Sequence, residues 1–117
     1  MENRQLGKNG PQVTVICLGT YPLGGAFSAV SEGQAIATVQ ASIDHGITFL
    51  DSAEGYGTSE SLVGKAIKGR RHETILASKV SGSDHSADHI RNALDASLKN
   101  LGTDYVDLYQ IHAPSPD

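Results

Sequence analysis

Three polar side chains each end an apolar segment of the sequence, and a tyrosine follows the first of them. Asp51, Lys79 and His112 hold the segment ends, and Tyr56 lies five residues after Asp51. A phenol, with a pKa of about 10, is a poor proton donor at neutral pH, but a nearby ammonium group stabilises the phenolate. A carboxylate would keep the lysine charged and aimed, and a neutral imidazole could donate to a carbonyl oxygen as negative charge builds there. The four residues are therefore candidates for delivering a proton to a carbonyl group that receives hydride.

This chemistry requires strands and helices that bring the four side chains together. Breakers at 7–11 between the segments 4–6 and 12–15 predict a hairpin. The further strands are predicted at 15–18, 47–50, 74–79 and 105–111, the first of them buried, with Cys17 as a small buried hydrophobe. Helices are predicted from the capping-box pair Ser31 and Gln34 to Gly46, over 59–68, and from Ser86 to Gly102, with Ile90, Leu94, Ser97, Leu98 and Leu101 on one stripe of the last.

Four strands separated by three helices predict parallel pairing, because each helical crossover returns the next strand in the same direction. A doubly wound nucleotide-binding sheet would carry G-x-G-x-x-G after its first strand, and residues 19–25 do not match it. The pattern therefore favours a β/α barrel, in which chemistry lies at the carboxyl ends of the strands. A strand-end aspartate can be a turn former and a lone histidine a structural residue, but their convergence on one rim favours a functional site.

Composition narrows the class of protein. The chain has 117 residues, of which 38% are apolar and 19% charged, as in a globular domain. No apolar run approaches the roughly 20 residues of a membrane span, and residues 1–4 do not begin a secretory signal. A net charge of −4 argues against nucleic-acid binding, and a single cysteine fits a reducing cytoplasm. The basic residues Lys65, Lys68, Arg70 and Arg71 are interpreted as a solvated helix end.

Two segments resemble the signatures of the aldo-keto reductase family. Residues 46–57 are similar to the first signature, including the spacing from Asp51 to Tyr56, and 59–67 resembles its continuation. Residues 97–112 resemble a second signature that closes on a catalytic histidine. The resemblance extends over nearly the whole chain, with Leu18-Gly19-Thr20 similar to the family's first strand.

The resemblance implies an oxidoreductase that reduces aldehydes and ketones to alcohols with NADPH, less often NADH, and without a metal. It implies that Tyr56 is the proton donor, that Lys79 lowers its pKa and that His112 orients the substrate carbonyl. Asp51 would pair with the lysine and help position the nicotinamide ribose. Gly19, Thr20 and Tyr21 would lie under the nicotinamide.

Family members have eight strand–helix units, whereas this chain passes its fourth strand and ends at Asp117. The expectation is thus a single partial aldo-keto reductase barrel domain over residues 1–117: the N-terminal half of a (β/α)8 TIM barrel, with parallel strands 1–4 and helices 1–3, preceded by a short hairpin and truncated after the fourth strand. Most of the cofactor site would lie in the absent half. The isolated chain is expected to bind NADPH weakly, to show negligible activity and to self-associate through open sheet edges.

Two alternatives remain open, and a third is considered. The chain could be a non-enzymatic half-barrel that pairs with itself or another chain, or a relative of regulatory subunits that acts as an interaction module. A metal site is the third, because His85 and His89 have the spacing of one helix face. Ser86 is the predicted helix cap, however, which puts His85 outside the helix, so these histidines are interpreted as solvated loop residues and no metal is expected.

Overall fold

The computed structural model describes residues 1–114. The last part of the expected 1–117 domain, up to Asp117, lies outside the described residues. The described strands and helices alternate as predicted. In chain order they are β1 (Asn3–Gln5), β2 (Gln12–Thr14), β3 (Cys17–Gly19), the 3-10 helix η1 (Tyr21–Gly24), α1 (Glu32–Asp44), β4 (Phe49–Asp51), α2 (Ser59–Ala66), the 3-10 helix η2 (Arg71–Glu73), β5 (Ile75–Val80), α3 (Ala87–Leu101) and β6 (Leu108–Ile111).

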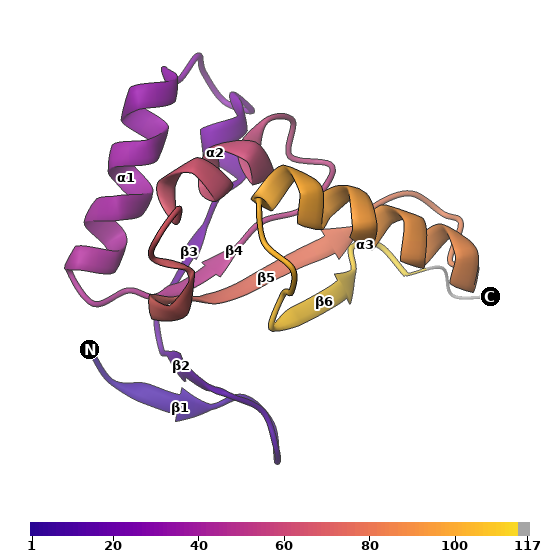
Figure 1. Ribbon diagram of the computed structural model, residues 1–117, viewed down its shortest axis with the longest axis horizontal. Coiled ribbons are helices and arrows are strands. Elements are labelled where there is room, and N and C mark those ends of the chain that lie inside the picture. The colour runs from indigo at the N-terminus through magenta and orange to yellow at the C-terminus, as the bar shows by residue number, and fades with distance from the viewer. Residues whose placement is uncertain (115–117) are drawn as a thin grey trace.

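The main sheet has four parallel strands in the order β3-β4-β5-β6, which is also their order along the chain. All three α-helices cover the same face of this sheet (Figure 1). A doubly wound sheet would carry helices on both faces. Sequential parallel strands with helices on one face form the consecutive units of a β/α barrel, so this fold prediction is confirmed.

The hydrophobic core lies between the helices and the covered face of the sheet. Leu50 and Leu76 are paired across β4 and β5 and are fully buried against Val39, Val63 and Leu101 from the three helices. The strands alternate, so Phe49 and Ile75 point to the opposite face and are only half-buried. The sheet therefore has one closed face and one open face.

Helix starts agree with the predicted caps. Ser31 and Gln34 form the reciprocal capping box of α1, and Ser86 accepts a hydrogen bond from His89 N at the start of α3. The predicted α3 stripe lies on the covered side of the helix: Ser97 and Leu101 are buried, and Ile90, Leu94 and Leu98 are half-buried. The prediction missed Ala93, which is also buried.

The prediction of a buried strand at 15–18 is wrong. The strand β3 begins only at Cys17, and Val15 and Ile16 are 43% and 52% exposed in the link from the hairpin. Cys17 is also exposed, because β3 is an edge strand and the helices cover only the face that carries Leu18. Desolvation, with a smaller contribution from the charge of Asp51, nevertheless raises the pKa of the Cys17 thiol to about 11.

The last strand is shorter than the predicted 105–111. Before β6 begins, the Tyr105 carbonyl accepts a hydrogen bond from Arg71 Nη2, and the Asp107 carboxylate accepts one from Leu76 N at 2.8 Å. The Asp107 N–H also donates to the Leu76 carbonyl at 2.8 Å, and the regular ladder begins with Leu108 beside Ala77.

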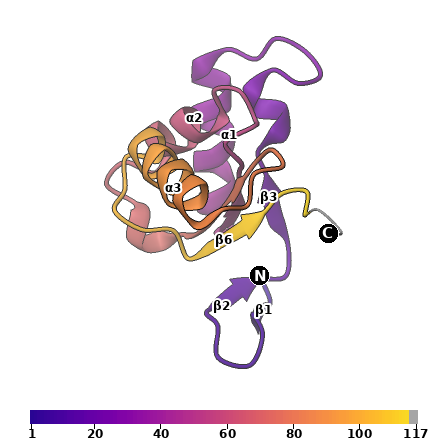
Figure 2. The same ribbon diagram turned by 90° about the vertical axis from the view of Figure 1, so that its right-hand side faces the viewer.

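The predicted N-terminal hairpin is confirmed by the antiparallel pairing of β1 with β2. It stands apart from the four-stranded body (Figures 1 and 2). Thr14 ties it to the sheet by accepting a hydrogen bond from Phe49 N. Within residues 1–114, no helix combines the length and apolarity that a membrane span requires.

Candidate active site

Lys79 lies at the centre of the candidate site and uses all three of its ammonium protons. Its Nζ donates to Asp51 Oδ2 at 2.8 Å, to the Ser52 carbonyl at 2.9 Å and to the Tyr56 hydroxyl oxygen at 3.4 Å. The Lys79 side chain is only 12% exposed, so its direction is well defined. Because the tyrosine oxygen accepts from the ammonium, its own proton is left to point elsewhere. No acceptor for that proton occurs among residues 1–114.

Asp51 is held from two sides. Its Oδ2 pairs with Lys79, and its Oδ1 accepts a hydrogen bond from Gln110 Nε2 at 3.2 Å. Gln110 stands beside Lys79 in the register of β5 and β6. Three neighbouring strands therefore fix this carboxylate.

His112 follows β6 and faces Tyr56. Its backbone N–H donates to the Val80 carbonyl, and its Nδ1 lies 3.4 Å from Ser81 Oγ. The rings of Tyr56 and His112 pack edge to face with centroids 5.4 Å apart. The sequence thus correctly placed Asp51, Tyr56, Lys79 and His112 at one end of the sheet.

Gly19 at the end of β3 and Thr20 directly after it differ in their access to a ligand. Gly19 pairs with Asp51 in the sheet and is exposed, with open space where a Cβ would stand. Thr20 is fully buried, and its hydroxyl donates to the Asp51 carbonyl and accepts from Ser59 at 2.7 Å. Thr20 can therefore act only by holding the backbone of Asp51, whereas Gly19 is open to a ligand.

Tyr56 sits on a loop that is packed tightly from both sides. Its carbonyl lies so close to Gly24 that a Cβ there would meet it at 2.0 Å. On the other side, Glu54 Oε1 accepts a hydrogen bond from Ser81 N in the loop after β5. The close backbone contact with Gly24 and the Glu54 carboxylate together hold the Tyr56 loop at the carboxyl end of the sheet.

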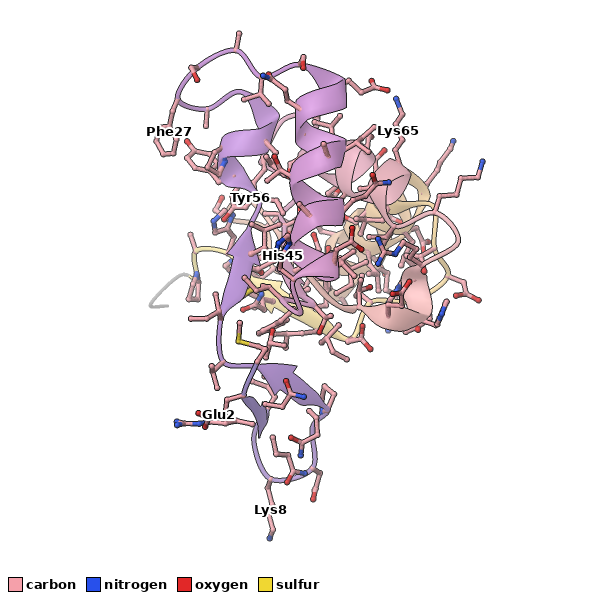
Figure 3. The ribbon with its side chains drawn as sticks, turned by 90° about the vertical axis from the view of Figure 1, so that its left-hand side faces the viewer. Glu2, Lys8, Phe27, His45, Tyr56 and Lys65 are labelled. Carbon is pink, nitrogen blue, oxygen red and sulfur yellow. The ribbon has the colours of Figure 1, made fainter. Side chains whose placement is uncertain are left out.

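Tyr21, Gly55, Tyr56 and His112 line an open hollow of about 370 Å³. The Tyr21 ring packs on Tyr56 at 4.9 Å and on Phe27 at 5.4 Å, and both Tyr21 and Phe27 are exposed. Figure 3 shows Phe27 near Tyr56, at the end of the molecule opposite Lys8 in the hairpin turn. The hollow thus joins an aromatic wall to the hydroxyl and imidazole groups.

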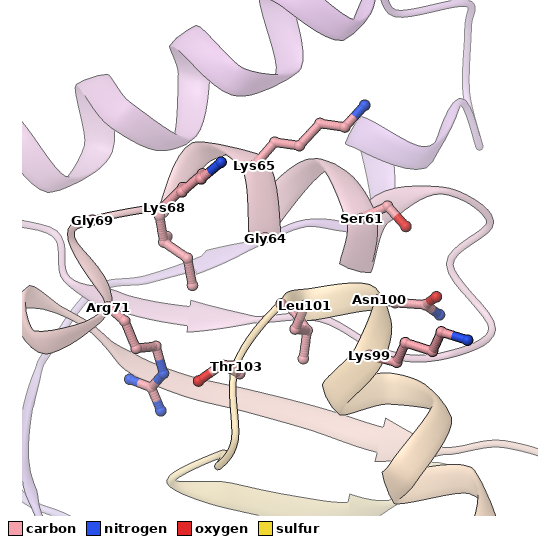
Figure 4. Close-up of a pocket in the computed structure, with 12 residues that line it drawn as sticks. Ser61, Gly64, Lys65, Lys68, Gly69, Arg71, Lys99, Asn100, Leu101 and Thr103 are labelled. Carbon is pink, nitrogen blue, oxygen red and sulfur yellow. The ribbon is translucent and has the colours of Figure 1, made fainter.

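A larger hollow of about 580 Å³ lies between the ends of α2 and α3 and contains none of the predicted site residues (Figure 4). It is lined by basic side chains, and two of them already have carboxylate partners: Lys65 bonds Glu32, and Arg71 bonds Asp107, each at 2.8 Å. The predicted solvated helix end is therefore only partly correct, since Arg70 and Arg71 are well-paired guanidinium groups. Chemistry is better placed in the smaller hollow.

The histidines of the considered metal site lie outside any ligand cluster. Across residues 1–114, no group of three or more histidine, cysteine or acidic side chains is arranged to hold a metal ion. His85 is a loop residue as predicted but is half-buried, whereas His89 lies within α3 and its side chain is 38% exposed. His89 Nδ1 lies 3.9 Å from Asp84 Oδ2.

Sequence reasoning missed the residues that hold the four candidates in place. Gln110 could have been found, because it lies two residues before His112 and strand alternation puts both on one face. Glu54 and Ser81 carried no such signal, since each acts from a loop. Ser59 was predicted only as a helix start, although its hydroxyl joins the ends of β3 and β4.

Comparison with known proteins identifies one family. Its model, described as the aldo/keto reductase family, matches residues 15–117. Among curated proteins, the aldo-keto reductase YhdN of Bacillus subtilis (strain 168) is 40% identical over 99% of this chain. The match covers 39% of YhdN, so the chain spans about two fifths of that relative's length.

Solved structures agree. The thermostable aldo-keto reductase Tm1743, solved with the inhibitor epalrestat, has a TM-score of 0.90 at 37% identity, over 99% of this chain and 44% of that one. An aldo-keto reductase from Klebsiella pneumoniae, solved with NADPH, has a TM-score of 0.81 at 37% identity, over 91% of this chain and 37% of that one. The strands, the helices and the matched residues lead to one conclusion: this chain belongs to the aldo/keto reductase family.

Proposed function

We propose that the protein carrying this chain reduces aldehydes or ketones to alcohols, with Tyr56 as proton donor. The observation that carries the proposal is the bond from Lys79 to the Tyr56 oxygen, which leaves the tyrosine proton free on the side of the hollow. Membership of an oxidoreductase family supports the reaction class. The substrate is a small carbonyl compound, and the location is the cytoplasm.

The proton is delivered by a short chain of groups. Tyr56 donates its hydroxyl proton to the carbonyl oxygen, and the phenolate that remains is stabilised by the Lys79 ammonium. Asp51, paired with Lys79 at 2.8 Å, keeps the ammonium charged and aimed. His112 faces the same hollow and donates a hydrogen bond to the carbonyl oxygen, which orients the substrate. Metal ions have no part in this proposal.

The residues around the hollow fit the nicotinamide end of a cofactor, and NADPH is proposed because similar aldo-keto reductases were solved with NADP or NADPH, with NADH as the alternative. Gly19 offers open space next to Asp51, and the exposed Tyr21 ring offers a flat apolar surface. We propose that Gly19, Tyr21 and Asp51 contact the nicotinamide end, while buried Thr20 positions Asp51. When bound, the cofactor supplies the hydride, and the resulting alkoxide oxygen takes the Tyr56 proton.

The 117-residue chain by itself is proposed to bind NADPH poorly. Its hollow is lined by only four residues and is open, which is little contact for a dinucleotide. Titration of the purified chain with NADPH, followed by fluorescence, tests this. Micromolar binding together with turnover of a simple aldehyde would contradict the proposal.

The proposed function is tested with Tyr56→Phe in a form of the protein that shows reductase activity. The change removes only a hydroxyl group, so folding should survive while reduction falls by about 10²–10⁴-fold, as when a general acid is lost. Tyr105→Phe is the matched control, because Tyr105 packs on Arg71 away from the hollow. Activity of Tyr56→Phe within tenfold of the parent would remove Tyr56 from the mechanism.

A further inference from the structure

The loops after β4, β5 and β6 are joined by a chain of contacts that ends on the His112 ring. Glu54, in the first loop, accepts a hydrogen bond from Ser81 N in the second. The Ser81 hydroxyl lies 3.4 Å from His112 Nδ1 and has no other partner among residues 1–114. Ser81 is thus fixed through its backbone, and its hydroxyl is free to serve the histidine.

We propose that Ser81 is a positioning residue that donates its hydroxyl proton to His112 Nδ1 and so fixes the histidine as the tautomer with hydrogen on Nε2. A neutral imidazole has one N–H donor and one bare nitrogen. If Nδ1 accepts from Ser81, the hydrogen must sit on Nε2. The second loop thereby determines which ring nitrogen can donate to a ligand.

The inference rests on the proposed function: the tautomer of His112 matters for catalysis because a substrate carbonyl oxygen can only accept a hydrogen bond, and His112 must donate it. His112 lines the hollow beside Tyr56, so its donor nitrogen must be the one not engaged by Ser81. With the opposite tautomer, Nε2 would present a lone pair to the carbonyl oxygen and repel it. Ser81 therefore sets up the electrophilic side of the site without touching the substrate.

A substitution at Gly55 provides a second, steric way to disturb the contact between the Ser81 hydroxyl and His112. A Cβ at Gly55 would lie 2.8 Å from Ser81 Oγ but 3.5 Å from Ser81 Cβ. Gly55→Ala must therefore push the serine hydroxyl aside. Once Ser81 is alanine, the same methyl group meets only an ordinary van der Waals contact. The two substitutions should then act on His112 through one and the same atom.

The molecule contains its own reference for the opposite tautomer. His45 Nδ1 lies 2.7 Å from the Ala41 carbonyl, and a carbonyl oxygen can only accept. His45 must therefore carry its hydrogen on Nδ1. One sample thus holds both tautomers, His45 of one kind and His112 of the other.

The test uses long-range 1H–15N correlation spectra of the full chain, labelled with 15N in its histidine rings. Spectra are recorded about two pH units above the ordinary imidazole pKa of about 6.5, where histidine rings are neutral. The His112 signals are assigned by their loss in His112→Asn. The parent is expected to show hydrogen on Nε2 for His112 and on Nδ1 for His45.

Ser81→Ala should lower the ratio of the Nε2–H to the Nδ1–H tautomer of His112 about fivefold, the effect of one ordinary hydrogen bond. Ser81→Thr, which keeps the hydroxyl, should restore it, and Ser83→Ala should leave it unchanged. Gly55→Ala should also lower the ratio, with no further change when combined with Ser81→Ala. These spectra need no catalysis, so they remain informative even if Tyr56→Phe proves active.

A parent His112 that carries its hydrogen on Nδ1 would overturn the proposal. So would an unchanged ratio in Ser81→Ala, or failure of Ser81→Thr to restore it. Additive effects of Gly55→Ala and Ser81→Ala would show that the two act through different contacts, which would also contradict it.

Discussion

Gly24 is the most sensitive support of the Tyr56 loop, and Gly24→Ala tests that role directly. A Cβ at Gly24 would stand 2.0 Å from the Tyr56 carbonyl oxygen and 3.0 Å from its carbon. These atoms belong to the backbone, so no side-chain rotation can relieve the contact. The loop must move by about 1 Å before the methyl group is at even the closest separation that real Cβ atoms reach.

The displacement would be felt in stability and in rate. Inserting a methyl group into a packed region costs about 1–3 kcal/mol. A shift of about 1 Å at a reacting group can lower a rate by about 100-fold. Gly24→Ala is therefore expected to lower the free energy of unfolding by about 1–3 kcal/mol and carbonyl reduction by about 100-fold.

Gly33→Ala in α1 is the matched control, because its Cβ would meet nothing within 4 Å. It should stabilise the chain by up to about 1 kcal/mol, since alanine is the better helix former. Urea denaturation followed by circular dichroism measures the stability of both variants, and NADPH-dependent reduction by a form that turns over measures the rate. A Gly24→Ala variant with parental rate and stability would refute the reasoning that backbone contact holds Tyr56.

Three further changes probe other features. Gly64→Ala would place a Cβ 2.6 Å from the Leu101 carbonyl oxygen. It should therefore destabilise the fold by about 1–2 kcal/mol, although alanine is the better helix former. A urea midpoint at or above that of the parent would contradict this. Partial desolvation and, to a smaller extent, the charge of Asp51 raise the pKa of the exposed Cys17 thiol to about 11. Its alkylation by iodoacetamide should therefore rise about tenfold per pH unit up to about pH 10, and a plateau near pH 9 would argue against that pKa. Asp107→Ala should lower the free energy of unfolding, measured by urea denaturation, by about 2–3 kcal/mol, because Leu76 N and Arg71 lose a charged acceptor. The control Asp104→Ala changes an exposed neighbour and should change stability by under about 0.5 kcal/mol.

The sequence was informative wherever local chemistry decided the structure. Ser31 and Ser86 mark helix starts because their hydroxyls satisfy amides within the same turn. Apolar runs that end in Asp51 and Lys79 predicted two neighbouring strand ends, and parallel pairing brought them together. The identity and spacing of the four candidate residues in the sequence are therefore enough to predict that they lie together.

Other features depended on contacts between distant segments. Cys17 reads as buried because its neighbours are apolar, yet only its position in an edge strand decides its exposure. The start of β6 depends on Arg71 and Asp107, which lie 36 residues apart. Ser81 and Glu54 are ordinary loop residues in sequence, and their roles follow from how adjacent loops pack.

The sequential order of β3, β4, β5 and β6 bears on how the protein is made. From β4 onward, each strand of the main sheet pairs with the one synthesised just before it, so no segment has to be threaded between strands already in place. As the chain leaves the ribosome, the Asp51–Lys79 ion pair can close once β5 emerges, and His112 can join it when β6 does. The proton-handling groups can thus be assembled on the nascent chain, strand by strand, in the direction of translation.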